Sequence, residues 1–297
     1  MFVIFGAAGN AGQVTARTLR QAGLPVRAVI RHPSQGAALM QWGCEITLAD
    51  LTDPVSVAAA IKGAYAVQML CPLVPNHDPQ AATTMRQMIR TAATALTHNP
   101  PAVLLGLSDY GAELDHGTGI TLLFHELEKA LKPIPTRLTL LRAAEHMQNW
   151  ARMLPVATAT GVLPSLHSPV DHPFPTVSAQ DVGLAAARLL QDDHHGNAPR
   201  IISIEGPQRV SVQDVANTLG QLMGKPVKPY AMPRDDWATR LIEIGYSANN
   251  AQLLVDLYDT HNAGGIDVEA GTERIYGQSS LQSVLATLLA QASAPTR

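Results

Sequence analysis

Short apolar segments alternate with amphipathic segments along the first half of the chain. Residues 2–5 form an apolar run rich in residues that favour β-structure. From Ala11 to Ala22 the apolar positions recur every three or four residues, which predicts a helix that ends at Gly23. Residues 25–30 are a second β-rich run. The chain therefore begins with a predicted strand, a glycine-rich turn, a helix and a second strand.

The same alternation continues up to residue 141. Asp-Pro pairs at residues 53–54 and 78–79 each place a helix N-cap before a proline, so they predict helix starts. Repeated strand–helix–strand units predict an α/β fold, a Rossmann-type doubly wound parallel sheet with right-handed crossovers. Ligands bind at the carboxyl ends of the strands in such a sheet. Further strands are predicted at residues 44–49, 66–70, 103–107 and 136–141, and helices at 79–97 and 122–131. The predicted strand ends carry Gly6, Arg31, Asp50, Cys71 and Ser108.

The second half of the chain predicts a further lobe. We expect residues 1–154 to form the NAD(P)-binding Rossmann domain, with the chain returning to it at about residues 176–205. We expect residues 155–297 to form a smaller C-terminal α+β lobe for the substrate. Residues 154–175 contain five prolines and little periodicity, which predicts a loop that covers a site or joins the lobes.

Two serine–aspartate pairs mark further predicted helix starts. Ser178-x-x-Asp181 and Ser211-x-x-Asp214 each precede an apolar helical run. Both have the spacing of a capping box, in which the two side chains satisfy backbone N–H groups of the first turn. We therefore predict structural roles for both aspartates.

Composition excludes several classes of protein. With 46% hydrophobic and 15% charged residues among 297, the chain is not intrinsically disordered. A net charge of −3 argues against a protein built mainly to bind nucleic acid, and no apolar stretch approaches the roughly 20 residues of a membrane helix. Cys44 and Cys71 are too few for a disulfide framework or a four-cysteine zinc site. The chain does not start with the basic and apolar segments of a secretory signal, so we expect a cytoplasmic enzyme or binding protein.

The glycine-rich turn is the first candidate binding site. Three glycines are spaced G-x-x-G-x-x-G between the first predicted strand and helix. Glycine adopts turn angles closed to other residues, lets the backbone approach a pyrophosphate, and lets helix and strand pack closely. Backbone N–H groups at the helix start then face the anion. We predict that the turn binds a dinucleotide, and a glycine-rich turn without a ligand is the alternative. The predicted cofactor contacts here are Gly6, Ala8, Gly9, Asn10, Ala11 and Gly12.

The end of the second predicted strand indicates which dinucleotide binds. An Asp or Glu at this position typically holds the ribose hydroxyls of NAD, but residues 28–33 contain no carboxylate. Arg31 lies there instead, and a guanidinium can pair with a 2′-phosphate through two hydrogen bonds. We therefore predict NADP(H) in preference to NAD(H). The alternative is an arginine that is solvated at a strand end.

Seven short motifs lie along nearly the whole chain. They are GAAGNAG (6–12), VIRHP (29–33), ADLTD (49–53), HELE (125–128), LLR (140–142), MQNW (147–150) and SAQDVG (178–183). Together they resemble the NmrA-like family of atypical extended short-chain dehydrogenase/reductases. The resemblance implies an NAD(P)-binding Rossmann domain and a small C-terminal substrate lobe. It also implies that Asp50 and Leu51 border the adenine and that Leu70, Cys71 and Pro72 line the nicotinamide side.

The resemblance leaves two kinds of function open. Some members of the family are NADPH-dependent reductases of quinones, dyes or other small acceptors. Other members are redox sensors that bind the cofactor and regulate a protein partner. Fold-level resemblance does not separate these functions.

The Tyr-x-x-x-Lys pair of ordinary short-chain dehydrogenases is missing. None of the five lysines has a tyrosine four positions before it. In that pair the lysine lowers the pKa of the tyrosine, so the phenol exchanges a proton with an alcohol or carbonyl oxygen. Its absence disfavours alcohol dehydrogenation and sugar-nucleotide epimerisation. Quinone reduction is not disfavoured, because the acceptor is electron-poor and water can protonate its reduced form.

Three residues are candidates for catalysis. Ser108, at the end of the fifth predicted strand, is a candidate hydrogen-bond partner of the substrate or the nicotinamide. Tyr110 follows it and is a candidate for stacking on the acceptor. His125 lies one helical turn from Glu128 and is a candidate proton donor. The alternatives are a turn serine, a packed loop tyrosine and a structurally hydrogen-bonded histidine. The predicted acceptor pocket consists of Tyr110, Asn149 and Trp150, with core packing as the alternative for Trp150.

The sequence thus predicts an NADPH-dependent oxidoreductase that transfers hydride to a small conjugated acceptor such as a quinone. A non-catalytic NADPH-binding sensor that acts through a protein partner is the alternative, and a sugar-nucleotide epimerase or dehydratase is disfavoured. A homodimer stays open. We expect no metal site and no nucleic-acid or membrane partner, and we interpret residues 192–195, Asp-Asp-His-His, as a solvated helix end.

Overall fold

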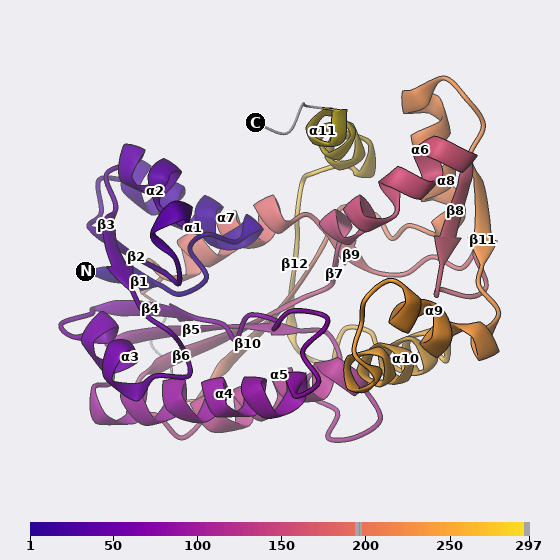
Figure 1. Cartoon of the computed structure of the whole chain (residues 1–297). Helices are drawn as coiled ribbons and strands as arrows, with labels where there is room; N and C mark the ends of the chain where they lie inside the picture. The colour runs from indigo at the N-terminus through magenta and orange to yellow at the C-terminus, as the bar shows by residue number, and fades with distance from the viewer. Residues whose placement is uncertain (194–195, 197, 294–297) are drawn as a thin grey trace.

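Eight parallel strands form the central sheet of the protein. The computed structural model describes residues 1–193, 196 and 198–293. The strands of the sheet are β1 (Phe2–Ile4), β2 (Val26–Ile30), β3 (Glu45–Leu48), β4 (Ala66–Met69), β5 (Val103–Asp109), β6 (Arg137–Ala143), β10 (Arg200–Glu205) and β12 (Glu273–Tyr276). They lie in the order β12-β10-β6-β5-β4-β1-β2-β3, and every neighbouring pair is parallel (Figure 1). This confirms the predicted Rossmann-type sheet.

Helices cover both faces of the sheet. They are α1 (Asn10–Gln21), α2 (Ala37–Gln41), α3 (Pro54–Ile61), α4 (Ala81–His98), α5 (Leu122–Leu131) and α7 (Ala179–Leu189). In Figure 1, α1, α2 and α7 lie on one face, and α3, α4 and α5 lie on the other. Successive residues of a strand point to opposite faces. Ile4 and Leu105 are therefore buried in the core beneath the first group, and Val3 and Leu104 in the core beneath the second.

The C-terminal part of the chain contributes β10 and β12 to the sheet and otherwise lies beside it (Figure 1). Its helices are α6 (Leu154–Thr160), α8 (Val212–Met223), α9 (Trp237–Glu243), α10 (Ala248–Asn262) and α11 (Leu281–Ser293). Its short strands are β7 (Glu145–His146), β8 (Val162–Ser165), β9 (Thr176–Val177) and β11 (Lys228–Ala231). Leu154, Leu219 and Leu285 join α6, α8 and α11 in one core, while Trp237 and Val255 join α9 and α10 in another. Short 3₁₀ turns are η1 (Pro33–Gln35), η2 (Gly119–Thr121), η3 (Met147–Arg152) and η4 (Arg234–Asp236).

The expected loop at residues 154–175 is wrong in its first half. This half contains α6 and β8, and β8 pairs with β11 in parallel. Pro155 stands in the first turn of α6, where a missing N–H leaves no helical hydrogen bond unmade. Pro164 lies in a sheet of two strands, in which each strand has one free edge. The prolines therefore suit these positions and do not break the elements.

The two predicted capping boxes differ. In the box at α8, the backbone N–H of Ser211 donates to Asp214 Oδ2 at 2.8 Å and the N–H of Asp214 donates to Ser211 Oγ at 3.1 Å, as predicted. At α7, Ser178 caps the helix by accepting from Gln180. The box is not formed there, because Asp181 Oδ2 accepts from the backbone N–H of Ser279 at 2.9 Å. Asp181 thus ties α7 to the segment after β12, a tertiary contact that local spacing does not reveal.

The structure also bears on the expectations about membrane helices, cysteines and the Asp-Asp-His-His segment. Within residues 1–193, 196 and 198–293, no helix is both long and apolar enough to cross a membrane. Cys44 and Cys71 are free, buried thiols. His194 and His195, predicted to lie in a solvated helix end, fall outside the described residues.

Candidate cofactor and acceptor site

A cleft with a volume of about 610 Å³ runs along the carboxyl edge of the sheet. β1 lies between β2 and β4, so the strand order reverses beside this cleft, where open α/β sheets bind their ligands. We call the part formed after β1 to β4 the cofactor half: Gly6, Gly9, Asn10, Gly12, Arg31, Asp50, Leu51, Leu70, Cys71 and Pro72. We call the part formed by the end of β5, the segment after β6, and α10 with the turn before it the acceptor half: Asp109, Tyr110, Glu145, His146, Asn149, Arg152, Tyr246, Tyr258 and His261. Ser108 lies on the cleft between the two halves.

The glycine-rich turn has the geometry of an anion site. Gly6 has φ +70°, a conformation that disfavours side chains, and its carbonyl accepts from the N–H of Gly9 at 2.9 Å. A Cβ on Gly12 would overlap the carbonyl oxygen of Gly6. Gly9 is the N-cap residue of α1 and has no side chain that could accept from the helix N–H groups. The first turn of α1 carries no acidic residue. The N–H groups at this helix start are thus left for a bound anion such as a pyrophosphate.

The end of β2 presents an unpaired cation. The side chain of Gln35 accepts from the backbone N–H groups of Arg31 and His32 at 3.1 and 3.0 Å, which fixes the backbone there. Within the described part of the chain, the Arg31 guanidinium forms no ion pair and is exposed at the rim of the cleft. The hydrogen bond from the Thr52 backbone, with a smaller contribution from Arg31, lowers the pKa of Asp50. Arg31 therefore remains available for an anionic ligand.

The remaining cofactor half is apolar. Leu51, Leu70 and Pro72 line the cleft beside Cys71, which is buried. Burial raises the pKa of the Cys71 thiol to about 12, so this thiol stays protonated and is no nucleophile. The structure brings to the cleft every residue that the sequence predicts to contact the cofactor: Gly6, Ala8, Gly9, Asn10, Ala11, Gly12, Arg31, Asp50, Leu51, Leu70, Cys71, Pro72 and Ser108.

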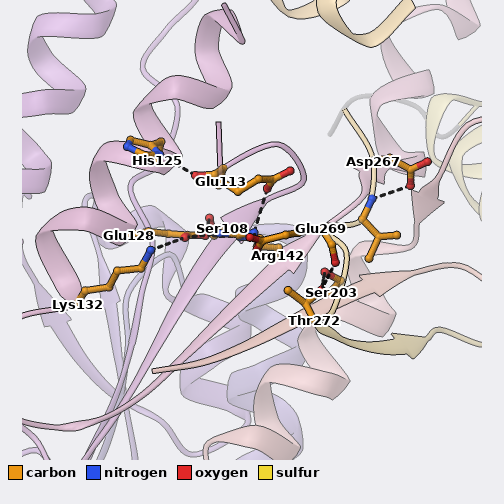
Figure 2. A network of polar contacts seen from close by, with 12 residues as sticks. Ser108, Glu113, His125, Glu128, Lys132, Arg142, Ser203, Asp267, Glu269 and Thr272 are labelled. Atoms are coloured by element: carbon orange, nitrogen blue, oxygen red, sulfur yellow. Dashed lines mark hydrogen bonds and ion pairs between the residues drawn. The ribbon is translucent and has the colours of Figure 1, made fainter. Parts of the chain in front are cut away.

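A buried charge network holds Ser108 (Figure 2). The hydroxyl of Ser108 donates to Glu128 Oε1 at 2.7 Å, and Arg142 donates to both carboxylate oxygens of Glu128 at 2.7 and 2.8 Å. Arg142 is only 2% exposed and also pairs with Glu113 and Glu269. Burial acts to raise the pKa of Glu128, but hydrogen bonds from Arg142 and Ser108 lower it overall. An ionised Glu128 only accepts, so the Ser108 proton is engaged and its lone pairs are what it offers to the cleft.

The other predicted catalytic and pocket residues separate in space. Tyr110 lines the cleft, but its hydroxyl points to Glu205 Oε2 at 3.5 Å. Burial raises the pKa of Tyr110, which keeps the phenol protonated. His125 does not line the cleft, and its Nδ1 lies 2.9 Å from the carbonyl oxygen of Ala112. Asn149 lines the cleft, whereas Trp150 packs in the core of α6, α8 and α11.

The acceptor half contains a polar cluster that sequence reasoning missed. Glu145 Oε2 lies 2.9 Å from Nε2 of His167, and its Oε1 accepts from the Tyr258 hydroxyl at 3.5 Å. His167 is buried behind Glu145, with its ring stacked 3.8 Å from the ring of Phe174. Burial lowers the pKa of His261 to about 4, so His261 is neutral at pH 7. These residues come from distant parts of the chain, and no spacing rule in the sequence joins them.

Glu145 is the centre of the hydrogen bonds in this cluster, and the ring of His261 packs edge-on against the ring of His167. One carboxylate oxygen of Glu145 and one ring nitrogen each of His167 and His261 lie within 4.8 Å of one another. Glu145 already accepts from both His167 and Tyr258. We therefore interpret these residues as a satisfied polar wall of the acceptor half.

Comparisons with known proteins agree with this geometry. Residues 6–122 match a family described as NAD(P)H-binding. The chain is 25% identical over 259 residues to the NAD(P)H azoreductase of Xenophilus azovorans, covering 87% of this chain and 86% of that protein. The fold is similar to that of an NADPH-dependent quinone oxidoreductase from Escherichia coli in complex with NADPH, with 22% identity, 97% and 100% of the two chains covered and a TM-score of 0.77. It is also similar to the triphenylmethane reductase of Citrobacter sp. complexed with NADP(H), with 17% identity, 97% and 100% coverage and a TM-score of 0.78.

Proposed function

We propose that this chain, which carries an NAD(P)H-binding domain at residues 6–122 and resembles the NmrA-like reductases, is an NADPH-dependent reductase of small conjugated acceptors such as quinones. One observation carries the proposal. A single cleft joins an uncapped helix N-terminus, suited to a pyrophosphate, to a half with aromatic walls and two carboxyl groups. A nicotinamide cofactor and a planar acceptor therefore have adjoining places in one cavity.

The cofactor half fits a dinucleotide. The backbone N–H groups of Asn10, Ala11 and Gly12, in the first turn of α1, would bind the pyrophosphate, and a Cβ at Gly12 would fill the space that the backbone needs. When bound, the reduced nicotinamide supplies the hydride. Ser108, whose proton is donated to Glu128, offers lone pairs to an N–H donor such as the carboxamide.

Arg31 supports NADPH over NADH. Its guanidinium is exposed on the cleft and has no carboxylate partner among the described residues. A 2′-phosphate would supply the missing anion through charge-assisted hydrogen bonds. Asp50, the nearby carboxylate, has its Oδ1 engaged by the N–H and hydroxyl of Thr52, both at 2.8 Å.

The acceptor half favours a planar conjugated molecule. Tyr246, Tyr258 and His261 line it with rings that can pack against an aromatic acceptor. The chain lacks the Tyr-x-x-x-Lys pair, so the site is poorly equipped to protonate a simple alkoxide. An electron-poor acceptor that spreads the arriving charge suits it better. The names of the relatives, an azoreductase and a quinone oxidoreductase, support this acceptor class.

The test is NADPH oxidation, followed by nicotinamide absorbance, against a panel of quinones and azo dyes with enzyme-free blanks. We expect saturable turnover well above the blank, with NADPH preferred to NADH. Binding of NADPH should be measured on the same protein by fluorescence. Protein that binds NADPH but turns over no acceptor would contradict the reductase and favour a sensor that acts through a protein partner.

A further inference from the structure

We propose that Asp109 donates the proton that accompanies hydride transfer to the acceptor, and that Glu145 is a positioning residue that acts through Asp109. The inference rests on the proposed reductase function and names the proton source of the same site. Asp109 is the last residue of β5 and pairs in register with Ala143 of β6, two positions before Glu145. Both carboxyl groups line the acceptor half. One carboxyl group at the end of β5 and one from the segment that follows the neighbouring strand β6 therefore face one cavity.

The two carboxyl groups have different partners. Glu145 is held by the ring of His167 at 2.9 Å and by the Tyr258 hydroxyl at 3.5 Å. Burial alone would raise the pKa of Glu145, but the charge and hydrogen bond of His167 lower it to about 2. Hydrogen bonds to the charged form explain this direction. Glu145 is therefore anionic throughout the physiological range.

Asp109 has weaker support, because the hydrogen bonds from the Tyr110 backbone and the Thr121 hydroxyl do not offset its burial. Its carboxylate accepts from the Thr121 hydroxyl at a long 3.5 Å, and it forms no ion pair in the part of the chain that the structure describes. Burial, and then the charge of Glu145, raise the pKa of Asp109 to about 7. The acid form is thus well populated at neutral pH. Pairs of carboxyl groups whose surroundings separate their pKa values are typical of sites that need one acid and one anion.

Other ionisable groups of the acceptor half do not compete for this role. Burial lowers the pKa of His146 and of His261, so both rings are neutral at pH 7. Burial raises the pKa of Tyr110 and of Tyr258, so both phenols hold their protons. Arg152 donates to the Tyr246 hydroxyl and to Asn149, both at 3.2 Å.

One hydride and one proton reach the acceptor in this step. A reduced nicotinamide bound in the cofactor half would supply the hydride and be oxidised, and the acceptor would be reduced. The O–H bond of the Asp109 carboxyl breaks, and an O–H or N–H bond forms on the reduced acceptor. Asp109 is left as a carboxylate beside the anionic Glu145, and a proton from solvent restores the acid. The pH dependence follows from this step. Activity requires protonated Asp109, so we expect it to fall as the pH rises through about 7.

The test combines turnover with a titration that needs no acceptor. Asp109→Asn keeps the size of the side chain but cannot supply the proton, so we expect kcat to fall by about 10²-fold with little change in the Kd of NADPH. The loss of rate above neutral pH should disappear in this variant. The matched control is Asp115→Asn, because Asp115 lies between β5 and α5 with its side chain 76% exposed. This control should keep the wild-type pH profile.

Glu145→Gln supplies the second readout. Removal of its charge should shift the alkaline limb of the pH profile to lower pH by about one unit. In infrared difference spectra of the cofactor-free protein, the carbonyl band of a protonated carboxyl should disappear as pH rises through about 7. It should be missing in Asp109→Asn and titrate at lower pH in Glu145→Gln.

Opposite results separate the two proposals. Wild-type turnover together with an unchanged rate and pH profile in Asp109→Asn would overturn the proton-donor role and leave the reductase standing. An infrared band that survives in Asp109→Asn would also overturn it. A wild type that reduces no acceptor would overturn the reductase function, and the proton-donor role with it.

Discussion

The two halves of the cleft are built by different means. The cofactor half uses backbone N–H groups, glycines and apolar contacts from segments that follow one another before residue 73. The acceptor half uses titratable side chains from β5, from the segment after β6 and from α10. The most distant of these residues in the sequence, Asp109 and His261, are 152 positions apart. The first half therefore suits one constant ligand, and the second can change its chemistry by single substitutions on a fixed frame. Ser108 joins the two halves through a buried charge network.

The largest expected effect comes from the network at the junction. Arg142→Met would leave the carboxylates of Glu128, Glu113 and Glu269 without their shared cation. Breaking a buried pair in this way costs about 3–5 kcal/mol of unfolding free energy, which denaturant titration measures. Arg86→Met is the matched control, because Arg86 pairs with Glu126 at the surface and should cost below about 1 kcal/mol. Equal losses of unfolding free energy in the two variants would contradict the conclusion that the buried network stabilises the fold more than a surface ion pair does.

The glycine turn gives the next largest effect and concerns the cofactor half alone. A Cβ at Gly12 would overlap the Gly6 carbonyl, whereas a Cβ at Gly9 would lie 3.3 Å from it. We expect Gly12→Ala to weaken NADPH binding by about tenfold to a hundredfold, and Gly9→Ala by much less. Fluorescence titration measures Kd, and thermal melts show whether each variant is folded. Equal Kd values in the two variants would argue against a dinucleotide on this turn.

Arg31 is the residue of the cofactor half that we expect to distinguish NADPH from NADH. Arg31→Ala should weaken NADPH binding by about tenfold and leave NADH binding nearly unchanged, since only NADPH carries the 2′-phosphate. Direct titration with each dinucleotide gives the ratio of the two Kd values. An unchanged ratio would remove the 2′-phosphate role of Arg31.

The smallest effect lies in the acceptor half. Tyr258→Phe removes a long hydrogen bond of 3.5 Å to Glu145 but keeps the ring on the cleft. We expect the KM of the acceptor to change by about two- to fivefold, with the Kd of NADPH unchanged. Tyr65→Phe is the control, because Tyr65 lies at the far end of the sheet, before β4, and is 45% exposed. A larger change in cofactor binding than in acceptor KM would contradict the division into halves.

Much of the fold could be predicted because local patterns specify it. The predicted helix at 122–131 coincides with α5, and the predicted strands lie within two residues of β1 to β6. The capping box at Ser211 forms because both partners lie in one helical turn. The box at Ser178 fails because Asp181 finds Ser279 across the fold, and no local signal indicates that contact.

The site divides in the same way. The glycine turn and Arg31 could be found from sequence because a strand, a turn and a helix bring them together within one short segment. His125 shows the limit, because its helical position did not reveal that its ring faces the carbonyl of Ala112 and not the cleft. Glu145 and His167 gave no signal, since their meeting depends on how the C-terminal segments pack against the sheet.

The sequence by itself determined the parallel sheet, the nucleotide-binding turn and the absence of a Tyr-x-x-x-Lys pair, because each depends on residues within a few positions of one another. Only the tertiary structure decided the state of the titratable groups. Asp109 and Glu145 are both carboxyl residues at strand ends, yet one has a pKa of about 7 and the other of about 2. The difference comes from burial and from the partners that distant segments bring to each carboxyl group.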